Sequence, residues 1–221
     1  MKKRDDSLLI YSGGMDSTVL LFDKNPKYIV CFKYHAINNN RELTTAKYFL
    51  NKWHNRNTNG YEIIEIPFFS FAKDYPMFQN ASAIPENTTR HSELKKCYIP
   101  FRNGIFIAIA TAIAEALKIK KVLLGVQTME QDVYPDARPE FIKNFNKTTM
   151  VGTKYGVKIV APYANKSKRS IAKLGKKILG EKELAISYSC LKGKRLHCGV
   201  CPSCLDRKWA MKGFDLTEYK C

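Results

Sequence analysis

The chain of 221 residues lacks any hydrophobic run long enough to cross a bilayer. Its longest apolar stretch, from Ile105 to Leu117, is shorter than the roughly 20 residues that a spanning helix needs and already contains Glu115, so it predicts a buried helix. The apolar run near the amino terminus is interrupted by Ser12-Gly13-Gly14 and is too short to match a secretory signal. We therefore expect no membrane span and a cytoplasmic location.

Acidic residues are scarce. The chain has 20 Asp and Glu residues against 37 Lys and Arg residues, which gives a formal net charge of +17. This excess favours anionic partners such as nucleotides, nucleic acid or an acidic protein. The lysines are scattered among many Asn and Ile residues, however, a pattern that drift in composition also produces. A nucleic-acid surface is therefore an open alternative and not the first expectation.

The sequence also lacks internal repeats and low-complexity tracts, and its length fits one folded unit. Short runs rich in Val, Ile and Leu alternate with helical patterns. This alternation is typical of a parallel sheet covered by helices on both faces, so we predict a doubly wound α/β fold. The predicted strands are 7–11, 28–32, 62–66, 122–126 and 157–160. One predicted helix begins at residue 16, and three others span 42–53, 103–117 and 203–212.

In a sheet of this kind, ligands bind beyond the carboxyl ends of the strands. The loops after Tyr11, Phe32 and Val126 are therefore the expected place for a functional site. The segment 69–98 has no clear periodicity and contains two prolines and many polar residues. It predicts a long loop that orders over a ligand.

The turn after the first predicted strand reads Ser12-Gly13-Gly14-Met15-Asp16-Ser17-Thr18 and opens a helix. Unpaired backbone N–H groups and the helix dipole favour an anion at such a position. The turn has no lysine, so it is neither the G-x-x-x-x-G-K-[ST] loop nor the dinucleotide pattern G-x-G-x-x-G. The hydroxyls of Ser12, Ser17 and Thr18 can donate to phosphate, whereas Asp16 is better suited to hold a Mg²⁺ ion that bridges phosphates.

A glycine turn with a Ser or Asp cap would explain any three residues of this turn, but not all seven. The string matches the SGGxDS signature and resembles the PP-loop ATPases, which cleave ATP between its α and β phosphates to leave AMP and pyrophosphate. The resemblance implies that ATP is the bound nucleotide.

Four of the seven cysteines lie close together in the sequence: Cys190, Cys198, Cys201 and Cys204. Paired C-x-x-C spacings can wrap four thiolates around one tetrahedral Zn²⁺, and four protein ligands leave no position for an activated water. We therefore predict a structural zinc site. A redox disulfide pair and an iron–sulfur cluster stay open, because thiolates alone do not identify the metal. His197 is interpreted as a bystander. The isolated Cys31, Cys97 and Cys221 are interpreted as buried small residues or a free terminal thiol.

Two further sequence motifs accompany the phosphate loop and the cysteine cluster. Tyr98-Ile99-Pro100-Phe101-Arg102-Asn103 precedes the apolar helix, and Tyr134-Pro135-Asp136-Ala137-Arg138-Pro139-Glu140-Phe141 follows the fourth predicted strand. Together with the phosphate loop and the cysteine cluster, these motifs resemble the 7-cyano-7-deazaguanine synthase (QueC) family over nearly the whole chain. The resemblance implies an adenine nucleotide alpha hydrolase-like PP-loop fold, with residues 1–185 as the ATPase domain and 186–221 as a zinc-binding segment packed on it.

The resemblance also implies an activity. Family members join 7-carboxy-7-deazaguanine and ammonia at the expense of ATP, through an amide, to give the nitrile 7-cyano-7-deazaguanine. A carboxylate is a poor electrophile, and adenylation turns its oxygen into a leaving group that ammonia can displace. Adenylating the amide oxygen and eliminating it would give the nitrile, with Mg²⁺ neutralising the departing pyrophosphate. A homodimer is implied as well.

The same resemblance implies roles for individual residues. The predicted catalytic residues are Asp16, Ser17 and Arg102. The predicted nucleotide-binding residues are Tyr11, Ser12, Gly13, Gly14, Met15, Asp16, Ser17, Thr18 and Asn103. The predicted contacts to the deazaguanine are Glu130, Tyr134, Asp136 and Arg138. An Arg–Asp pair beside a proline turn often only fixes loop geometry, so a structural role for Asp136 and Arg138 is an open alternative.

Two stretches depart from the usual family pattern. Members usually carry Tyr-Gly-Gln-Arg-His after the second strand, where this chain has Tyr34-His35-Ala36-Ile37-Asn38. Before the Tyr-Pro-Asp motif they usually have an Asp, an aromatic residue, Ser and Gly, where this chain has Glu130-Gln131-Asp132-Val133. Both departures fall in the expected base-binding region, so the substrate or product can differ.

Three alternatives to nitrile synthesis follow. QueC-like proteins of phages and antiphage-defence (CBASS-type) operons resemble variants that stop at the amide or join a deazaguanine to a protein amine, and positive charge would help to dock an acidic or CD-NTase-like partner. A PP-loop tRNA thiolase also pairs SGGxDS with cysteines, but it needs reactive sulfur, for which only Cys31 and Cys97 remain. A zinc-containing nucleic-acid binder would need no ATP turnover.

Overall fold

The computed structural model describes residues 4–54, 60–89, 91–127, 130 and 133–220. Its centre is a sheet of five strands in the order β3-β2-β1-β4-β5, in which every pair of neighbours is parallel. The strand order reverses between β1 and β4, which is where ligands bind in sheets of this type. The strands are β1 (Asp5–Ile10), β2 (Pro26–Lys33), β3 (Tyr61–Glu65), β4 (Lys121–Leu123) and β5 (Lys158–Val160).

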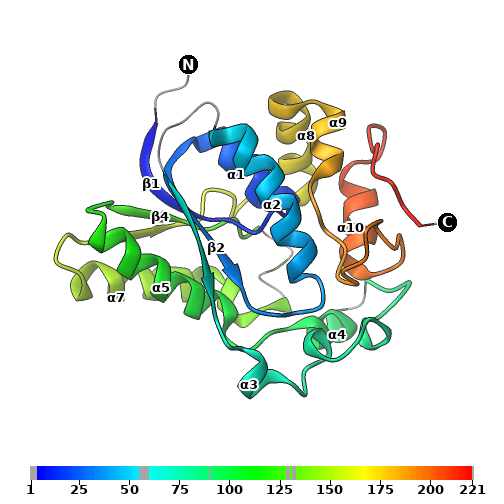
Figure 1. Cartoon of the computed structure of the whole chain (residues 1–221), viewed down its shortest axis with the longest axis horizontal. Coiled ribbons are helices and arrows are strands. Elements are labelled where there is room, and N and C mark those ends of the chain that lie inside the picture. Colours follow the sequence, from blue (N-terminus) through cyan, green and yellow to red (C-terminus); the bar gives the residue numbers. More distant parts are fainter. Residues whose placement is uncertain (1–3, 55–59, 90, 128–129, 131–132, 221) are drawn as a thin grey trace.

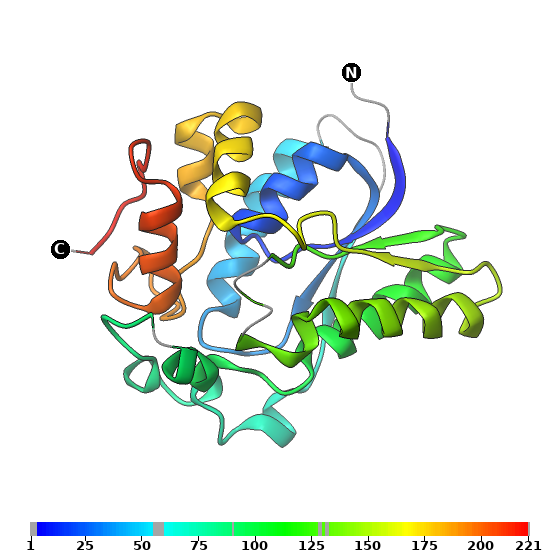
Figure 2. The same ribbon diagram turned by 180° about the vertical axis from the view of Figure 1, so that it is seen from behind.

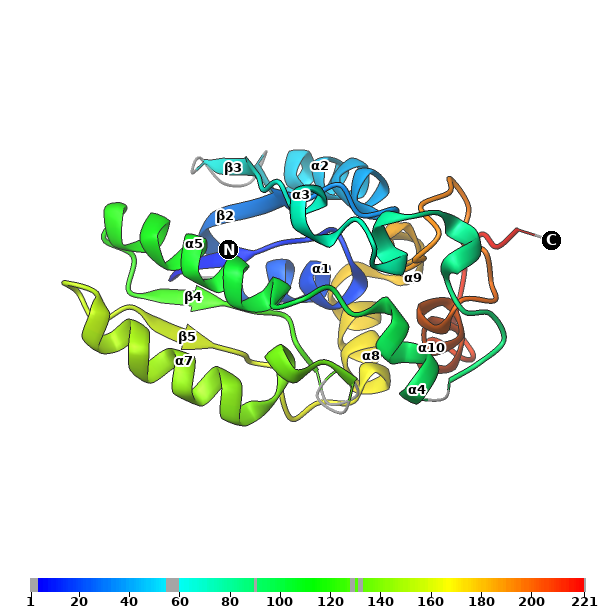
Figure 3. The same ribbon diagram turned by 90° about the horizontal axis from the view of Figure 1, so that it is seen from below.

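Helices cover both faces of the sheet (Figure 1). One face carries α1 (Met15–Lys24), α2 (Asn39–His54) and α8 (Lys168–Leu179), and the other carries α5 (Arg102–Ala116) and α7 (Pro139–Gly152) (Figure 3). Alternate residues of β1 pack into the two layers, because Leu8 belongs to the core beneath α5 and Leu9 to the core beneath α1. The prediction of a doubly wound α/β fold with a parallel sheet is confirmed.

The five predicted strands are all present, with ends that differ by up to three residues from those predicted. The predicted helices at 42–53, 103–117 and 203–212 correspond to α2, α5 and α10 (Pro202–Ala210). The sequence prediction missed α7, α8 and α9 (Glu181–Ile186). For α8 a signal existed, because the Ser167 side chain caps the helix by accepting from the backbone N–H of Ser170.

The expectation of a long irregular loop over 69–98 is wrong. The segment contains short helices: α3 (Phe69–Ala72), η1 (Pro76–Phe78), η2 (Ala81–Ala83), α4 (His91–Leu94) and η3 (Lys95–Cys97). Helices of three or four residues make only one turn, which is too short to show a hydrophobic period. Met77, Phe78 and Ile84 are buried, and the backbone N–H of Ile37 donates to Met77 O at 2.9 Å, so the segment packs against the loop after β2.

The carboxyl-terminal segment contacts the rest of the chain where its helix α10 packs on α8 (Figure 2). The Arg207 side chain of α10 is fully buried and connects this segment to α9. Its guanidinium donates hydrogen bonds of 2.7–3.1 Å to Thr217 Oγ1, Ser187 Oγ, Ser189 Oγ, Leu184 O and Ala185 O. The predicted boundary between 1–185 and 186–221 stays a prediction.

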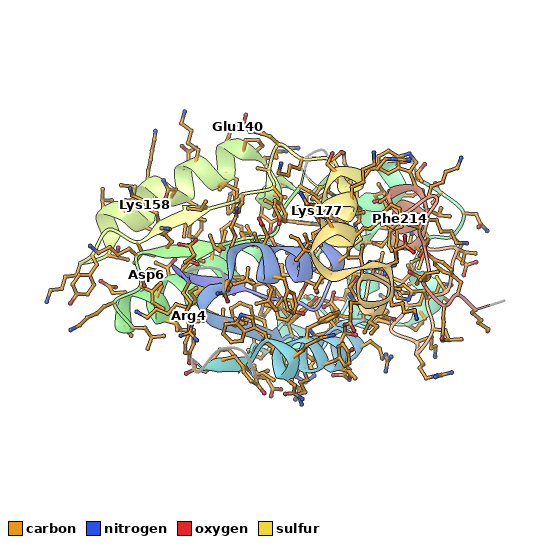
Figure 4. The ribbon with its side chains drawn as sticks, turned by 90° about the horizontal axis from the view of Figure 1, so that it is seen from above. Arg4, Asp6, Glu140, Lys158, Lys177 and Phe214 are labelled. Carbon is orange, nitrogen blue, oxygen red and sulfur yellow. The ribbon has the colours of Figure 1, made fainter. Side chains whose placement is uncertain are left out.

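The two ends of the strands differ in their surroundings. Arg4 and Asp6, at the amino end of β1, lie on the left in Figure 4, Lys177 of α8 lies near the middle, and Phe214 lies on the right. The carboxyl ends of the strands therefore point toward α8 and the carboxyl-terminal segment. Among the helices of the described residues, none combines the length and the apolar character needed to span a membrane.

Candidate active site

A cavity of about 210 Å³ lies beyond the carboxyl ends of β1, β2 and β4. The loops after Tyr11, Phe32 and Val126, where a site was expected, all contribute to its wall. The first turn of α5, Lys168 of α8 and Tyr188 of the carboxyl-terminal segment also line it. Met77, Cys97 and Tyr98 line it from the segment 69–98. One cavity thus receives side chains from both halves of the sheet.

The loop after β1 approaches α2 so closely that position 13 requires glycine. Gly13 has a φ of +79°, and a Cβ there would lie 2.4 Å from the carbonyl oxygen of Glu42. Gly14 is the N-cap of α1, and no side chain caps the helix at this residue. The hydroxyls of Ser12 and Ser17 lie 3.0 Å apart beside it and line the cavity. Backbone N–H groups and hydroxyls thus converge at a helix N-terminus, the usual setting of an anion site.

The other predicted nucleotide-binding residues of this loop divide into two groups. Tyr11 and Met15 line the cavity, whereas Gly13 and Thr18 do not. Thr18 is fully buried, and its Oγ1 lies 3.1 Å from Tyr11 OH. The Thr18 hydroxyl is therefore bonded behind the loop, where it supports Tyr11.

Asp16 and Lys168 form a buried ion pair beside the phosphate loop. Lys168 Nζ lies 3.7 Å from Asp16 Oδ2, and the side chains are 10% and 12% exposed. Burial lowers the pKa of Lys168, but the carboxylates of Asp16, Asp206 and Glu130 outweigh burial and leave that pKa raised. Asp16 Oδ1 is buried without a hydrogen-bond partner within the described part of the chain. A free carboxylate oxygen beside an anion site suits Mg²⁺, so the residues fit this ion.

Glu130 places a further carboxylate in the cavity. Burial raises the pKa of Glu130 to about 7, and Asp16 contributes to the rise, whereas Lys168 and Arg102 oppose it. A second cavity of about 120 Å³ shares Glu130 and Lys168 with the first, and its wall includes Asp206. Glu130 therefore stands between two spaces and can exchange a proton near neutral pH.

A second charged cluster lies on the β2 side of the cavity. The guanidinium carbon of Arg102 lies 5.9 Å from the centre of the Tyr34 ring and 6.0 Å from that of Phe106. Burial raises the pKa of Glu42, while Arg102 opposes this rise. Burial lowers the pKa of Arg102, but Tyr34 and Glu42 more than compensate, so its pKa is raised. Arg102 is a half-buried, permanently charged group at the start of α5.

Asp136 holds the N-terminus of α5 in place. Its Oδ2 accepts from the backbone N–H of Asn103 at 2.7 Å, and the Asn103 side-chain amide donates to the carbonyl of Asp136 at 3.4 Å. Asp136, Asn103 and Tyr134 all line the cavity, whereas Arg138 is exposed and is not part of the lining. The structure therefore brings Glu130, Tyr134 and Asp136 together with Arg102 and leaves Arg138 outside.

Two charged residues of the cavity belong to no motif recognised in the sequence: Lys168 and Glu42. Lys168 is the first residue of α8 and directly follows its N-cap, Ser167. A Ser cap after the last strand was therefore the available sequence signal for a helix starting at Lys168. Among 37 basic residues this lysine has no distinguishing neighbour. Glu42 lies in α2 and reaches the cavity only because α2 crosses the phosphate loop.

The four predicted metal ligands meet in space. The Sγ atoms of Cys190, Cys198, Cys201 and Cys204 all lie within 4.8 Å of one another, and the Sγ atoms of Cys198 and Cys204 are 3.9 Å apart. Zn–S bonds of about 2.3 Å place tetrahedral sulfur ligands roughly 3.8 Å apart, so the cluster fits one zinc ion. Backbone N–H groups of Lys192 and Cys198 donate to Cys190 Sγ, both at 3.4 Å. Such bonds stabilise thiolate ligands.

His197 and the other described cysteines stand apart from this cluster. The His197 Nε2 accepts from the backbone N–H of Ser189 at 3.1 Å, and burial lowers the pKa of this imidazole to about 4. It is therefore a neutral structural group, in line with its interpretation as a bystander. Burial raises the pKa of Cys31 to about 12 and that of Cys97 to about 11, so neither is a thiolate at neutral pH. Cys221 lies outside the described residues.

The comparisons with known proteins identify the family. A family model described as "Queuosine biosynthesis protein QueC" matches residues 6–215. The chain belongs to the QueC family. Proteins named 7-cyano-7-deazaguanine synthase are similar along their whole length. One from Desulfotalea psychrophila is 34% identical over 97% of this chain and 98% of its own length. Others come from Methanococcus maripaludis strain S2 (36% identical, 96% of both chains) and Porphyromonas gingivalis ATCC 33277 (34%, 100% of both).

Membership of the QueC family confirms the predicted resemblance, and with it an enzyme family of the ATP-using PP-loop type. In this QueC family member, both departures from the usual pattern reach the cavity. Tyr34 and Asn38 of the stretch 34–38 line the cavity, and so does Glu130 of the stretch 130–133. Gln131 and Asp132 lie outside the described residues. The phosphate loop and the cysteine cluster, by contrast, follow the expected pattern.

Proposed function

We propose that this chain is an ATP-dependent ligase that adenylates 7-carboxy-7-deazaguanine and reacts it with ammonia, through the amide, to give 7-cyano-7-deazaguanine. The observation that carries the proposal is the single cavity that joins the phosphate loop and the Asp16–Lys168 pair to the aromatic and charged end around Arg102. The similar proteins are named 7-cyano-7-deazaguanine synthase, which supports the same product.

Binding of ATP follows from the phosphate loop. The N-terminus of α1 and the hydroxyls of Ser12 and Ser17 would hold the pyrophosphate half, and the charged Lys168 would neutralise it. Asp16 would hold Mg²⁺ through Oδ1, and when bound this ion would withdraw charge from the leaving pyrophosphate. Arg102, half-buried and charged, would stabilise the negative charge that develops as the carboxylate oxygen attacks the α-phosphate.

The two halves of the reaction balance with these groups. The carboxylate oxygen bonds to the α-phosphorus and pyrophosphate leaves; ammonia then adds to the acyl carbon and AMP leaves, which gives the amide. The amide oxygen is adenylated by a second ATP, and loss of AMP and of both N–H protons of the amide gives the nitrile. Glu130, with a pKa of about 7, would accept a proton from the attacking nitrogen. Tyr134 and Asp136 would contact the base or fix the start of α5 next to it.

The experiment is incubation of zinc-loaded protein with 7-carboxy-7-deazaguanine, ATP, Mg²⁺ and ammonium, with products identified by mass spectrometry. The proposal expects the nitrile with AMP and pyrophosphate. The amide alone would identify a variant that stops half-way. Absence of both products, with no AMP formed, would contradict the proposal.

A second candidate function keeps the activation step and transfers the deazaguanine to a protein amine. Two observations favour it: the departures at Asn38 and Glu130 lie at the cavity, and the net charge of +17 suits an acidic protein partner. In this case a protein encoded in the same operon would gain the mass of the base when ATP and the acid are supplied. We also propose a homodimer, which sedimentation of the purified protein tests.

A further inference from the structure

The side chain of Asn38 carries a buried acceptor that no described protein group satisfies. Asn38 stands between β2 and α2, lines the cavity and is 4% exposed. Its Oδ1 is buried and has no hydrogen-bond partner in the part of the chain that the structure describes. Buried polar atoms in native proteins are nearly always bonded, so an unbonded one in a cavity wall indicates a ligand that bonds to it.

The orientation of this amide is fixed by Glu42. Asn38 Nδ2 donates to Glu42 Oε1 at 2.8 Å, and Tyr34 OH donates to Glu42 Oε2 at 3.1 Å. A half-turn of the amide would set Oδ1 against a carboxylate oxygen, and two acceptors repel each other. The main chain is fixed too, because the carbonyl of Asn38 accepts from the N–H groups of Arg41 and Glu42 at 3.1 and 3.0 Å. Oδ1 is therefore the atom that faces away from Glu42.

The walls beside Asn38 are flat and aromatic. The rings of Phe32 and Phe106 stack with their centres 4.2 Å apart and 15° between their planes. The Tyr34 ring meets Phe106 edge-on, with centres 5.4 Å apart, and all three rings line the cavity. Aromatic walls suit a planar heterocycle, and an acceptor beside them suits an N–H group on the edge of that heterocycle.

We propose that Asn38 Oδ1 accepts a hydrogen bond from the exocyclic amine of a purine-type base and so selects aminated bases over analogues without the amine. The proposal rests on the proposed function, which brings two such bases into the cavity, the adenine of ATP and the deazaguanine. Asn38 is also a position at which the chain departs from the family pattern, since members usually carry His there. A carbonyl oxygen only accepts, whereas a histidine ring can donate or accept, so this change alters which ring edges are bonded.

The test is isothermal titration calorimetry with two pairs of ligands, measured without turnover. One pair is ATP and inosine triphosphate, and the other is 7-carboxy-7-deazaguanine and 7-carboxy-7-deazahypoxanthine, which lacks the 2-amino group. The wild type should bind the aminated member of one pair more tightly by on the order of 10-fold or more. Asn38→Ala should lose that preference, and the exposed neighbour Asn40→Ala should keep it. The pair that shows the preference identifies the base.

Equal affinity of the wild type within both pairs would overturn the proposal, and so would a preference that Asn38→Ala keeps. Should Asn38→Ala fail to fold, Asn38→Ser takes its place, and the wild-type comparison stands by itself. Because binding is measured apart from catalysis, a lack of ligase products would remove the proposed function while the ATP pair still tests Asn38.

Discussion

Lys168 Nζ lies 3.7 Å from Asp16 Oδ2, and this pair joins α8 to the first turn of α1 at the cavity. In the proposed function each partner would have a separate use: the unbonded carboxylate oxygen of Asp16 would bind Mg²⁺, and the cationic group of Lys168 would bind phosphate. A buried pair of this kind contributes little net stability, because desolvation offsets the attraction. Its position at the phosphate loop is the reason that we propose a functional role for this pair.

Asp16→Ala should leave the fold intact and abolish turnover. The fold survives because Asp206 and Glu130 still compensate the charge of Lys168. Turnover should fall by on the order of 100-fold or more, since an electrostatic contact to the leaving group is lost. Thermal melting and pyrophosphate release measure the two effects. Asp74→Ala, an exposed aspartate outside the cavity, is the control. Full activity of Asp16→Ala would exclude Asp16 from catalysis.

Lys168→Met should reduce turnover by roughly 100-fold, because it keeps the length of the side chain and removes the cation that faces the phosphates. The affinity for ATP should fall as well, and both effects are read from initial rates at varied ATP. The matched control is Lys173→Met, an exposed lysine on the same helix. Equal loss in both variants would show that the helix surface, and not the ion pair, is responsible.

Cys201→Ala should destabilise the whole chain. The proposed zinc ligands Cys190, Cys201 and Cys204 belong to the same core cluster as the sheet, so loss of the metal would reach the α/β layers. We expect a loss of about 3 kcal/mol or more, which lowers the Tm of a chain of this size by roughly 10 °C. Cys31→Ala, which removes a buried thiol outside the cluster, separates the cavity effect from the metal effect. One zinc per wild-type chain, measured by elemental analysis, should be absent in Cys201→Ala.

Glu130→Gln should remove part of the pH dependence of stability. The folded-state pKa of Glu130 is raised from 4.5 to about 7 by burial and Asp16, so the folded state binds a proton that the unfolded state has released. The stabilisation is complete below the unfolded pKa and is lost as pH rises through about 7. The wild type should therefore lose roughly 1–3 kcal/mol relative to Glu130→Gln between pH 4.5 and 8. Melts without nucleotide measure this, with Glu140→Gln on the exposed side of α7 as control (Figure 4). Parallel pH curves for wild type and Glu130→Gln would contradict it.

The sequence predicts those parts of the site that local chemistry defines. Gly13 is required by backbone geometry at one turn, and the cysteine spacings are set by one short loop, so both features are readable without a fold. The parallel sheet was predictable for a similar reason, because strands such as β2 contain a continuous apolar run that is buried, residues 29–32.

The rest depends on contacts between distant parts of the chain. Lys168 meets Asp16 only after α8 packs on α1, and Glu42 reaches Arg102 only because α2 crosses the phosphate loop. Asp136 was predicted as a base contact, and its carboxylate accepts from the N–H of Asn103, 33 residues away in sequence. The short helices of 69–98 are held by burial of Met77 and Phe78, which no periodic pattern reveals.

The most direct test of the account follows the oxygen atoms of the substrate. When 7-carboxy-7-deazaguanine labelled with ¹⁸O in its carboxylate is incubated with the enzyme, ATP, Mg²⁺ and ammonium, adenylation must transfer a labelled oxygen to AMP. We predict ¹⁸O in the phosphate of AMP, with unlabelled pyrophosphate. Label in inorganic phosphate together with ADP, or unlabelled AMP formed alongside product, would contradict activation at the α-phosphate.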